Sequence, residues 1–286
     1  AFLLQLATDP EVHTFAVYAE GFKDGDGLAF ARAAQKVTAS GRDIIFYKAG
    51  RTTEGKTATS GHTASLAGDY DVCESIIREA GAFVASGFNE YLDLVKVSSL
   101  MGHKKWNGPS LAAMSNAGYE TVGIADAVRG DGWDLCLAKL GDSTRERLQT
   151  ALVKGKLNTL VDVRNPLDIT PMGNDEVHED VVRALLDDPN VDMVLCASVP
   201  LTPVMATLAE GVPEDMSIRS EGSLVSRLAR IRETSTKPIV ACIDSGLLYD
   251  PMARMMEDKG IPCFRSADEA VRTIGKYLAG RLKNGR

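Results

Sequence analysis

Short apolar runs that alternate with helix-like segments limit what this chain can fold into more than any other feature of its sequence. In the first third, runs at 14–19, 43–47 and 82–85 precede segments with helical spacing at 26–40, 69–80 and 88–100. Strands that alternate with helices form right-handed βαβ units, and such units build a parallel sheet. We therefore expect an α/β fold here, with a buried strand at 14–19 and a helix at 69–80 that turns Val72, Ile76 and Ile77 inward.

The same alternation starts again after a linker-like stretch at 101–109. Further strands are expected at 111–115, 134–138, 193–198, 238–243 and 261–264, and helices at 121–128, 142–154, 176–186, 222–234, 249–259 and from 266 to about 282. The chain is therefore predicted to form two doubly wound parallel-sheet domains, at 1–104 and 105–286, with a flavodoxin-like strand order in the second.

The composition is typical of a globular protein without a membrane-spanning segment. Of 286 residues, 44% are hydrophobic and 25% charged, and no apolar run approaches the ~20 residues that span a bilayer. The net charge of −7 argues against a nucleic-acid surface. Five cysteines without a CxxC pair indicate buried thiols in a reducing compartment. We expect a cytoplasmic protein with no metal site and with neither nucleic acid nor membrane as a partner.

Residues 48–70 contain the groups best suited to phosphoryl chemistry. The stretch is rich in Gly, Ser and Thr and has no periodic apolar face, so a loop is predicted. Such a loop can direct main-chain N–H groups and hydroxyls at an anion. His62 is the single histidine of the stretch, and a neutral imidazole has a lone pair that can act as a nucleophile. A solvated loop with an incidental histidine is the alternative that spacing alone leaves open.

Two other groups stand where strands are expected to end. Glu20 follows the run at 14–19, and a turn made of Ser115, Asn116, Ala117 and Gly118 lies between a strand and a helix. Ligands of parallel sheets bind at the carboxyl ends of the strands, and a helix N-terminus can bind phosphate. A surface carboxylate and an ordinary βα turn are the structural alternatives.

The sequence around His62 resembles a known family. Gly61-His-Thr-Ala-Ser-Leu-Ala-Gly68, preceded by Lys48-Ala-Gly-Arg-Thr52, resembles the phosphohistidine loop of NDP-forming acyl-CoA synthetases, relatives of the succinyl-CoA ligase alpha subunit. Residues 18–24 and 115–118 resemble the family's glutamate motif and its phosphate-binding turn. The resemblance implies that His62 carries a phosphoryl group from an acyl phosphate to ADP and that Glu20 orients it. It also implies that Thr63, Ser65 and the turn Ser115 to Gly118 hold the phosphate.

The resemblance further implies components outside this chain. The family reaction converts acyl-CoA, phosphate and ADP into acid, CoA and ATP. CoA and ADP or ATP with Mg²⁺ would be substrates bound mainly elsewhere, on CoA-binding and ATP-grasp domains or subunits. Residues 1–104 would be a phosphohistidine domain truncated at its N-terminus, and 105–286 a second, ligase-CoA flavodoxin-like domain. We expect an oligomer in which another chain or a rearranged segment covers the open edge of the first sheet.

Two departures from the family pattern leave other functions open. Ala64 stands where the family usually has Gly, and Tyr119-Glu120 replaces the Gly-Pro after the turn. Glu120 would repel a phosphate if it pointed at one. The alternative is a non-catalytic scaffold or regulatory subunit that kept the ligase fold. A receiver-like binding module is a weaker option, because the sequence shows no clustered acidic pocket.

Overall fold

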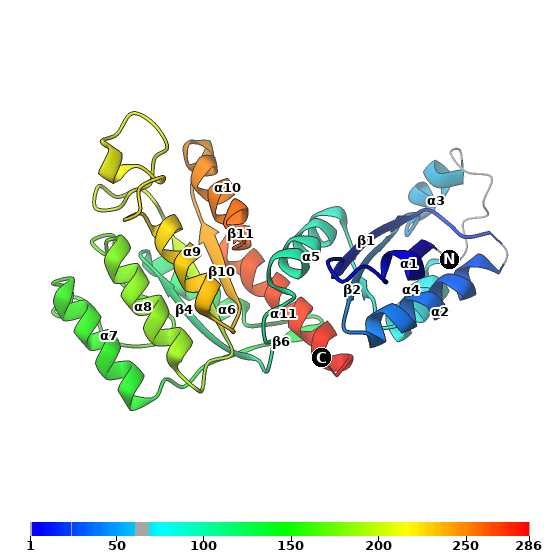
Figure 1. Cartoon of the computed structure of the whole chain (residues 1–286), viewed down its shortest axis with the longest axis horizontal. Coiled ribbons are helices and arrows are strands. Elements are labelled where there is room, and N and C mark those ends of the chain that lie inside the picture. The colour runs from blue at the N-terminus through cyan, green and yellow to red at the C-terminus, as the bar shows by residue number, and fades with distance from the viewer. Residues whose placement is uncertain (1, 24, 61–68, 286) are drawn as a thin grey trace. The chain divides into compact units, whose positions relative to one another are not determined.

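The computed structural model describes residues 2–23, 25–60 and 69–285 (Figure 1). The chain divides into two compact units, one of residues 1–103 with 279–286 and one of residues 104–278. The units are defined by packing, so the predicted division into family modules at 104/105 stays a prediction.

The first unit contains a sheet of three parallel strands in the sequential order β1-β2-β3. Its elements are α1 (Phe2–Leu6), β1 (Thr14–Ala19), α2 (Asp26–Ala39), β2 (Asp43–Lys48), α3 (Thr53–Ser60), α4 (Tyr70–Glu79), β3 (Phe83–Val84) and α5 (Phe88–Met101). The central strand β2 carries the core, because Ile44, Ile45 and Phe46 are fully buried. Helices α2 and α4 pack on β2 and on each other, and α5 packs on β1 and β2.

Three local predictions for this unit were wrong. Strand β1 lies at the edge of the sheet and is not buried throughout, since Phe15 is the one buried residue of this strand. In α4, Ile77 points inward as predicted, but Val72 and Ile76 are 57% and 36% exposed. The stretch 48–70 is not loop throughout, because α3 occupies Thr53–Ser60.

No described strand pairs with the outer edge of β1. An apolar groove of about 650 Å³ runs along this edge between α1, β1 and α2, lined by residues that include Phe2, Leu6, Val17 and Phe30. The groove and the unpaired strand edge together form a surface on which a further segment can pack.

The second unit contains a parallel sheet in the order β11-β10-β9-β4-β7, with β8 also paired to β4. Its elements are β4 (Ser110–Ser115), α6 (Gly118–Ala127), β5 (Arg129–Gly130), β6 (Trp133–Asp134), β7 (Cys136–Leu137), α7 (Asp142–Lys154), β8 (Leu167–Asp168), α8 (Asp175–Asp187), β9 (Met193–Ser198), η1 (Glu214–Met216), α9 (Leu224–Thr234), β10 (Ile239–Ile243), η2 (Leu247–Tyr249), α10 (Asp250–Asp258), β11 (Cys263–Phe264) and the part of α11 (Ala267–Lys283) up to residue 278. The rest of α11 belongs to the first unit. The five main strands follow the flavodoxin-like order, which confirms the predicted fold class.

The strands of the second sheet are apolar, as expected for a sheet whose faces are covered by helices. Strands β9 and β10 are buried at every position, as expected for the interior of a parallel sheet. All five cysteines are free thiols; Cys196, Cys242 and Cys263 are buried, whereas Cys73 is only partly buried and Cys136 is exposed. In the described part of the chain, every helix is too short or too polar to cross a bilayer.

Candidate functional site

Glu20 lies at the carboxyl end of the edge strand β1, directly after Ala19. Its carboxylate oxygen Oε1 accepts the hydroxyl of Tyr18 at 3.1 Å, and its main-chain oxygen accepts the ammonium of Lys48 at 2.8 Å. Burial, followed by the hydrogen bond to Glu20, raises the pKa of Tyr18. The Glu20 side chain is only half-buried, so a ligand can approach its carboxylate.

The neighbouring strand β2 ends at Lys48, and the chain continues from there toward His62. Gly50 adopts φ +79°, a left-handed conformation that favours glycine, and it lies against Lys56 and Thr59 of α3. The hydroxyl of Thr52 accepts the N–H of Gly55 at 3.1 Å at the start of that helix. The predicted site residues His62, Thr63 and Ser65, and Ala64 with them, lie outside the described residues. The contact between Glu20 and His62 therefore stays a prediction.

The turn at 115–118 precedes α6 at the carboxyl end of β4, as predicted. Ser115 and Asn116 are almost fully buried. The Ser115 hydroxyl accepts the N–H of Ala117 at 3.0 Å, and the Asn116 amide bonds the main-chain N–H and oxygen of Val199 at 2.7 and 2.9 Å. Both side chains are thus engaged within the protein. An anion at this turn would meet the main-chain N–H groups that start α6 at Gly118.

Glu120 points into the core behind this turn and not toward solvent. It is 2% exposed, accepts the Ser115 hydroxyl, and has its other oxygen 3.6 Å from the thiol sulfur of Cys242. Burial raises the pKa of Glu120 to about 7, although the hydrogen bond from Ser115 opposes the rise. A protonated Glu120 carries no charge with which to repel a phosphate.

Other carboxylates gather at the same end of the sheet. The hydroxyl of Tyr119 donates to Asp244 at 2.9 Å. Asp168 lies so close to Gly118 that a Cβ at Gly118 would stand 3.0 Å from its Oδ2. The side-chain amide of Asn165 accepts the N–H of Ala113 at 2.9 Å and donates to two main-chain oxygens. The turn that contains Asn165 therefore has a structural role.

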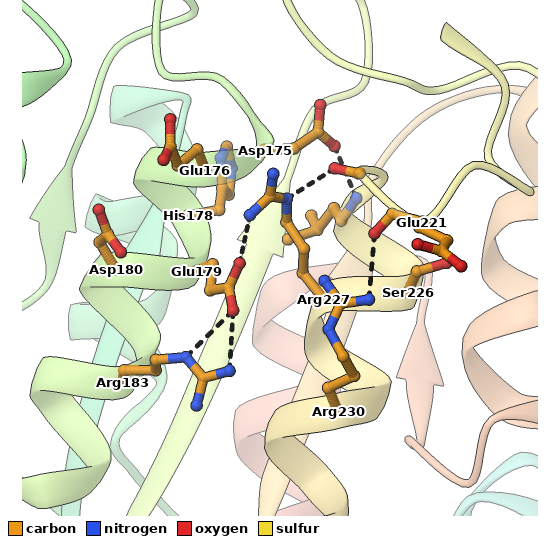
Figure 2. A network of polar contacts seen from close by, with 12 residues as sticks. Asp175, Glu176, His178, Glu179, Asp180, Arg183, Glu221, Ser226, Arg227 and Arg230 are labelled. Carbon is orange, nitrogen blue, oxygen red and sulfur yellow. Dashed lines mark hydrogen bonds and ion pairs between the residues drawn. The ribbon is translucent and has the colours of Figure 1, made fainter. Parts of the chain in front are cut away.

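A polar network that the sequence pattern does not predict joins α8 to α9 in the second unit. Figure 2 shows Glu179 between Arg183 and Arg227, which both donate to its carboxylate. Burial opposes ionisation, but the two arginines lower the pKa of Glu179 overall. Asp175 accepts the N–H groups of Ala206 and Leu224 at 2.9 and 2.7 Å. Since its carboxylates are paired, this network holds helices together and offers no site.

The second unit also contains a histidine, His178 of α8. His178 is fully buried, and its Nδ1 lies 2.9 Å from the Asn174 oxygen. Burial lowers the pKa of His178 to about 4. Within residues 2–23, 25–60 and 69–285, no group of three His, Cys, Asp or Glu side chains is arranged to hold a metal ion.

Fold and site geometry together define a class: a flavodoxin-like α/β protein with a carboxylate where β1 ends and a Gly/Ser/Thr-rich segment where the adjacent strand ends. Residues 1–98 match the family described as "Succinyl-CoA ligase like flavodoxin domain". The chain is 30% identical to the ADP-forming acetate–CoA ligase II subunit alpha of Pyrococcus furiosus, over 98% of this chain and 56% of that protein. It is also 30% identical to the ADP-forming acetate–CoA ligase I of Archaeoglobus fulgidus, over 96% of this chain and 36% of the relative.

The fold is shared with a solved structure as well. The dinucleotide forming acetyl-coenzyme A synthetase 1 of Ca. Korarchaeum cryptofilum, solved with phosphate and ADP, superposes with a TM-score of 0.80 at 23% identity, over 99% of this chain and 56% of that one. The chain spans 56% or less of the length of these relatives. Residues 1–98 carry the succinyl-CoA-ligase-like flavodoxin domain, and nearly the whole chain is similar to ADP-forming acetate–CoA ligases, in agreement with the resemblance seen in the sequence.

Proposed function

We propose that this chain is the phosphohistidine-carrying part of an NDP-forming acyl-CoA synthetase. His62 would take a phosphoryl group from an acyl phosphate and pass it to ADP. CoA, the nucleotide and Mg²⁺ would be bound mainly on CoA-binding and ATP-grasp domains or subunits outside this chain. The free thiols fit a reducing compartment, and we include a cytoplasmic location in the proposal.

The proposed chemistry has two balanced transfers. First, a His62 ring nitrogen forms a bond to phosphorus while the bond from phosphorus to the acyl oxygen breaks, and the acid leaves as a carboxylate with the bonding electrons. Second, a terminal oxygen of ADP bonds to phosphorus while the N–P bond breaks, which returns the lone pair to the ring and forms ATP. Glu20 would accept the N–H of the other ring nitrogen, fix the tautomer and stabilise the positive charge on the ring.

The observation that carries this proposal is the position of Glu20. Its half-buried carboxylate stands at the carboxyl end of β1, and the segment that leads to His62 leaves the adjacent strand β2. Carboxyl ends of parallel strands are where such folds bind their ligands. The similarity to ADP-forming ligases over nearly the whole chain supports the same assignment.

Labelling tests the proposal. The full-length protein with its ATP-grasp partner is incubated with [γ-³²P]ATP and Mg²⁺, and acid-labile, base-stable label is counted. We expect label in the wild type, none in His62→Ala, and labelling about 100-fold slower in Glu20→Gln, which has lost the orienting charge. His13→Ala is the matched control, because His13 is exposed and lies at the other end of β1.

A non-catalytic scaffold or regulatory subunit remains the second candidate. Its support is the crowding at the start of α6, where Asp168 abuts Gly118 and Ser115 already takes the N–H of Ala117. This function predicts that the wild type stays unlabelled even with an intact partner.

A further inference from the structure

Lys48 is an unusual residue in the first unit. Lysines are seldom fully buried unless they are paired, yet Lys48 on the central strand is 2% exposed. Its ammonium donates to the main-chain oxygens of Glu20 and Ala49, at 2.8 and 2.6 Å. No ion pair between Lys48 and a carboxylate is seen among the described residues. Carbonyl oxygens solvate the charge without neutralising it, so both hydrogen-bond partners of the ammonium are neutral groups.

The two carbonyls show where this cation acts. Glu20 is the first residue after β1, and Ala49 the first after β2. The strands remain in register there, because the Ala49 N–H donates to the Ala19 oxygen at 2.9 Å. Lys48 therefore joins the Glu20 main chain to the beginning of the segment that leads to His62.

We propose that Lys48 is a positioning residue of this site: its buried ammonium fixes the Glu20 main chain against the segment after β2 and supplies positive charge for a phosphoryl group. The identity of the ligand rests on the proposed function, whereas the contacts of Lys48 are independent of it. In a partly desolvated site a cation attracts an anion more strongly than it would in water. A phosphate or acyl phosphate would be attracted by this charge.

The surrounding charges agree with this role. Burial is the main effect that lowers the pKa of Lys48, and the positive charge of Lys56 lowers it further, whereas Cys73 and Glu20 act in the opposite direction. Burial raises the pKa of the Cys73 thiol, and the charge of Lys48 partly offsets that rise. Cys73 is therefore a built-in reporter of the charge at Lys48.

Kinetics with a small phosphoryl donor provide the test. The full-length protein is incubated with [³²P]acetyl phosphate, and label on His62 is followed in the wild type, Lys48→Met, Lys48→Arg and Lys36→Met. We expect Lys48→Met to raise the KM for acetyl phosphate about 10-fold or more, the effect of losing a charged partner. Lys48→Arg should recover most of that loss, and Lys36→Met, a matched change at an exposed lysine of α2, should match the wild type.

A second readout separates charge from folding. In a Cys136→Ser background, the pH dependence of alkylation should show a higher pKa for Cys73 in Lys48→Met and an unchanged pKa in Lys48→Arg. A purely structural lysine would lower the thermal midpoint in both variants and leave the KM of the folded protein unchanged, and that result overturns the inference.

Failure of the proposed function is recognised separately. If the wild type takes no label on His62, binding of inorganic phosphate is measured by calorimetry in the same variants. Phosphate binding that weakens about 10-fold or more in Lys48→Met supports the role of Lys48 without phosphotransfer. Equal binding in both proteins, or no binding by the wild type, overturns it.

Discussion

Glu120 shows how burial changes the meaning of one residue. In the sequence it is a carboxylate beside a phosphate-binding turn, and repulsion is the natural expectation. In the structure it is buried against Ser115 and Cys242, and its pKa is raised to about 7. Desolvation disfavours the charged form, so near pH 7 Glu120 is a neutral carboxylic acid in about half of the molecules, and in most of them at lower pH.

This placement predicts a specific dependence of stability on pH. The pKa of Glu120 is higher folded than unfolded, so its contribution is fully present below about pH 4.5 and is lost as pH rises toward about 7. The total loss is about 3 kcal/mol as an upper value. Glu120→Gln cannot ionise, so it should gain stability relative to the wild type between pH 5 and 8. Urea unfolding across that range measures the difference.

Glu214→Gln is the control, since Glu214 is an exposed glutamate of the same unit. A difference between wild type and Glu120→Gln that is the same at pH 5 and pH 8 would show that Glu120 is ionised throughout.

Burial also explains which site residues the sequence could predict. Glu20 follows a short strand, so its place at a strand end could be read from the apolar pattern. The burial of Lys48 could not be predicted, because a lysine beside a Gly- and Thr-rich stretch is typical of a solvated surface. Ser115 and Asn116 could be placed at a turn, but their bonds to Ala117 and Val199 depend on chain segments distant in sequence or on local geometry.

At the scale of elements, helices with a regular apolar spacing were predictable, and the short polar helix α3 was not. Helix α7 begins and ends at the predicted residues 142 and 154, because its apolar spacing is regular. Helix α3 was missed because its eight residues, TEGKTATS, include Gly, Ser and three Thr and present no apolar face. Val72 and Ile76 were misplaced because apolar spacing shows which residues share a helix face and not how much of that face is covered.

The link between α8 and α9 leads to a prediction about elements. Arg227 donates to Glu179 and to the Gly222 oxygen at 2.6 Å, with its side chain 23% exposed. Arg227→Met keeps most of the stem but removes the bond to Glu179 of α8 and the bond to the Gly222 oxygen, just before α9. We expect a loss of about 1–2 kcal/mol in the free energy of unfolding, the usual cost of losing a charge-assisted bond. Thermal and urea unfolding measure it.

Lys154→Met is the matched control for Arg227→Met. Lys154 pairs with Glu176 and Asp180 of the same helix α8, but its side chain is 51% exposed. Exposed ion pairs contribute little, so we expect no measurable change. Equal effects from the two substitutions would mean that the buried network adds nothing beyond surface charge.

For the whole molecule, the open edge of β1 matters most. The alternation of strands and helices predicted both parallel sheets, because periodicity is a local property of the sequence. What lies beside an edge strand is not local. Main-chain oxygens of His13 and Ala19 accept N–H groups of Asp43 and Ala49, so odd-numbered residues of β1 bond to β2. By alternation, the N–H groups of Ala16 and Tyr18 face the unpaired edge.

We predict that this edge is covered in solution, by another chain or by a rearranged segment, because an unpaired strand beside an apolar groove favours association. Sedimentation equilibrium should then show a mass that rises with concentration, and Ala16→Pro should weaken association about 10-fold or more, through the lost hydrogen bond and the steric effect of the ring at the edge. Proline is tolerated at an outward-facing edge position, so the β1–β2 ladder should persist. Val17→Pro, a change at a residue whose N–H faces β2, should instead disrupt the strand.

Hydrogen exchange identifies a rearranged segment of the same chain as the cover, because such a segment slows exchange at Ala16 and Tyr18 even in a monomer. A monomer in which these two amides exchange freely while those of Phe15 and Val17 stay protected would have a bare, ordered edge and would contradict the prediction.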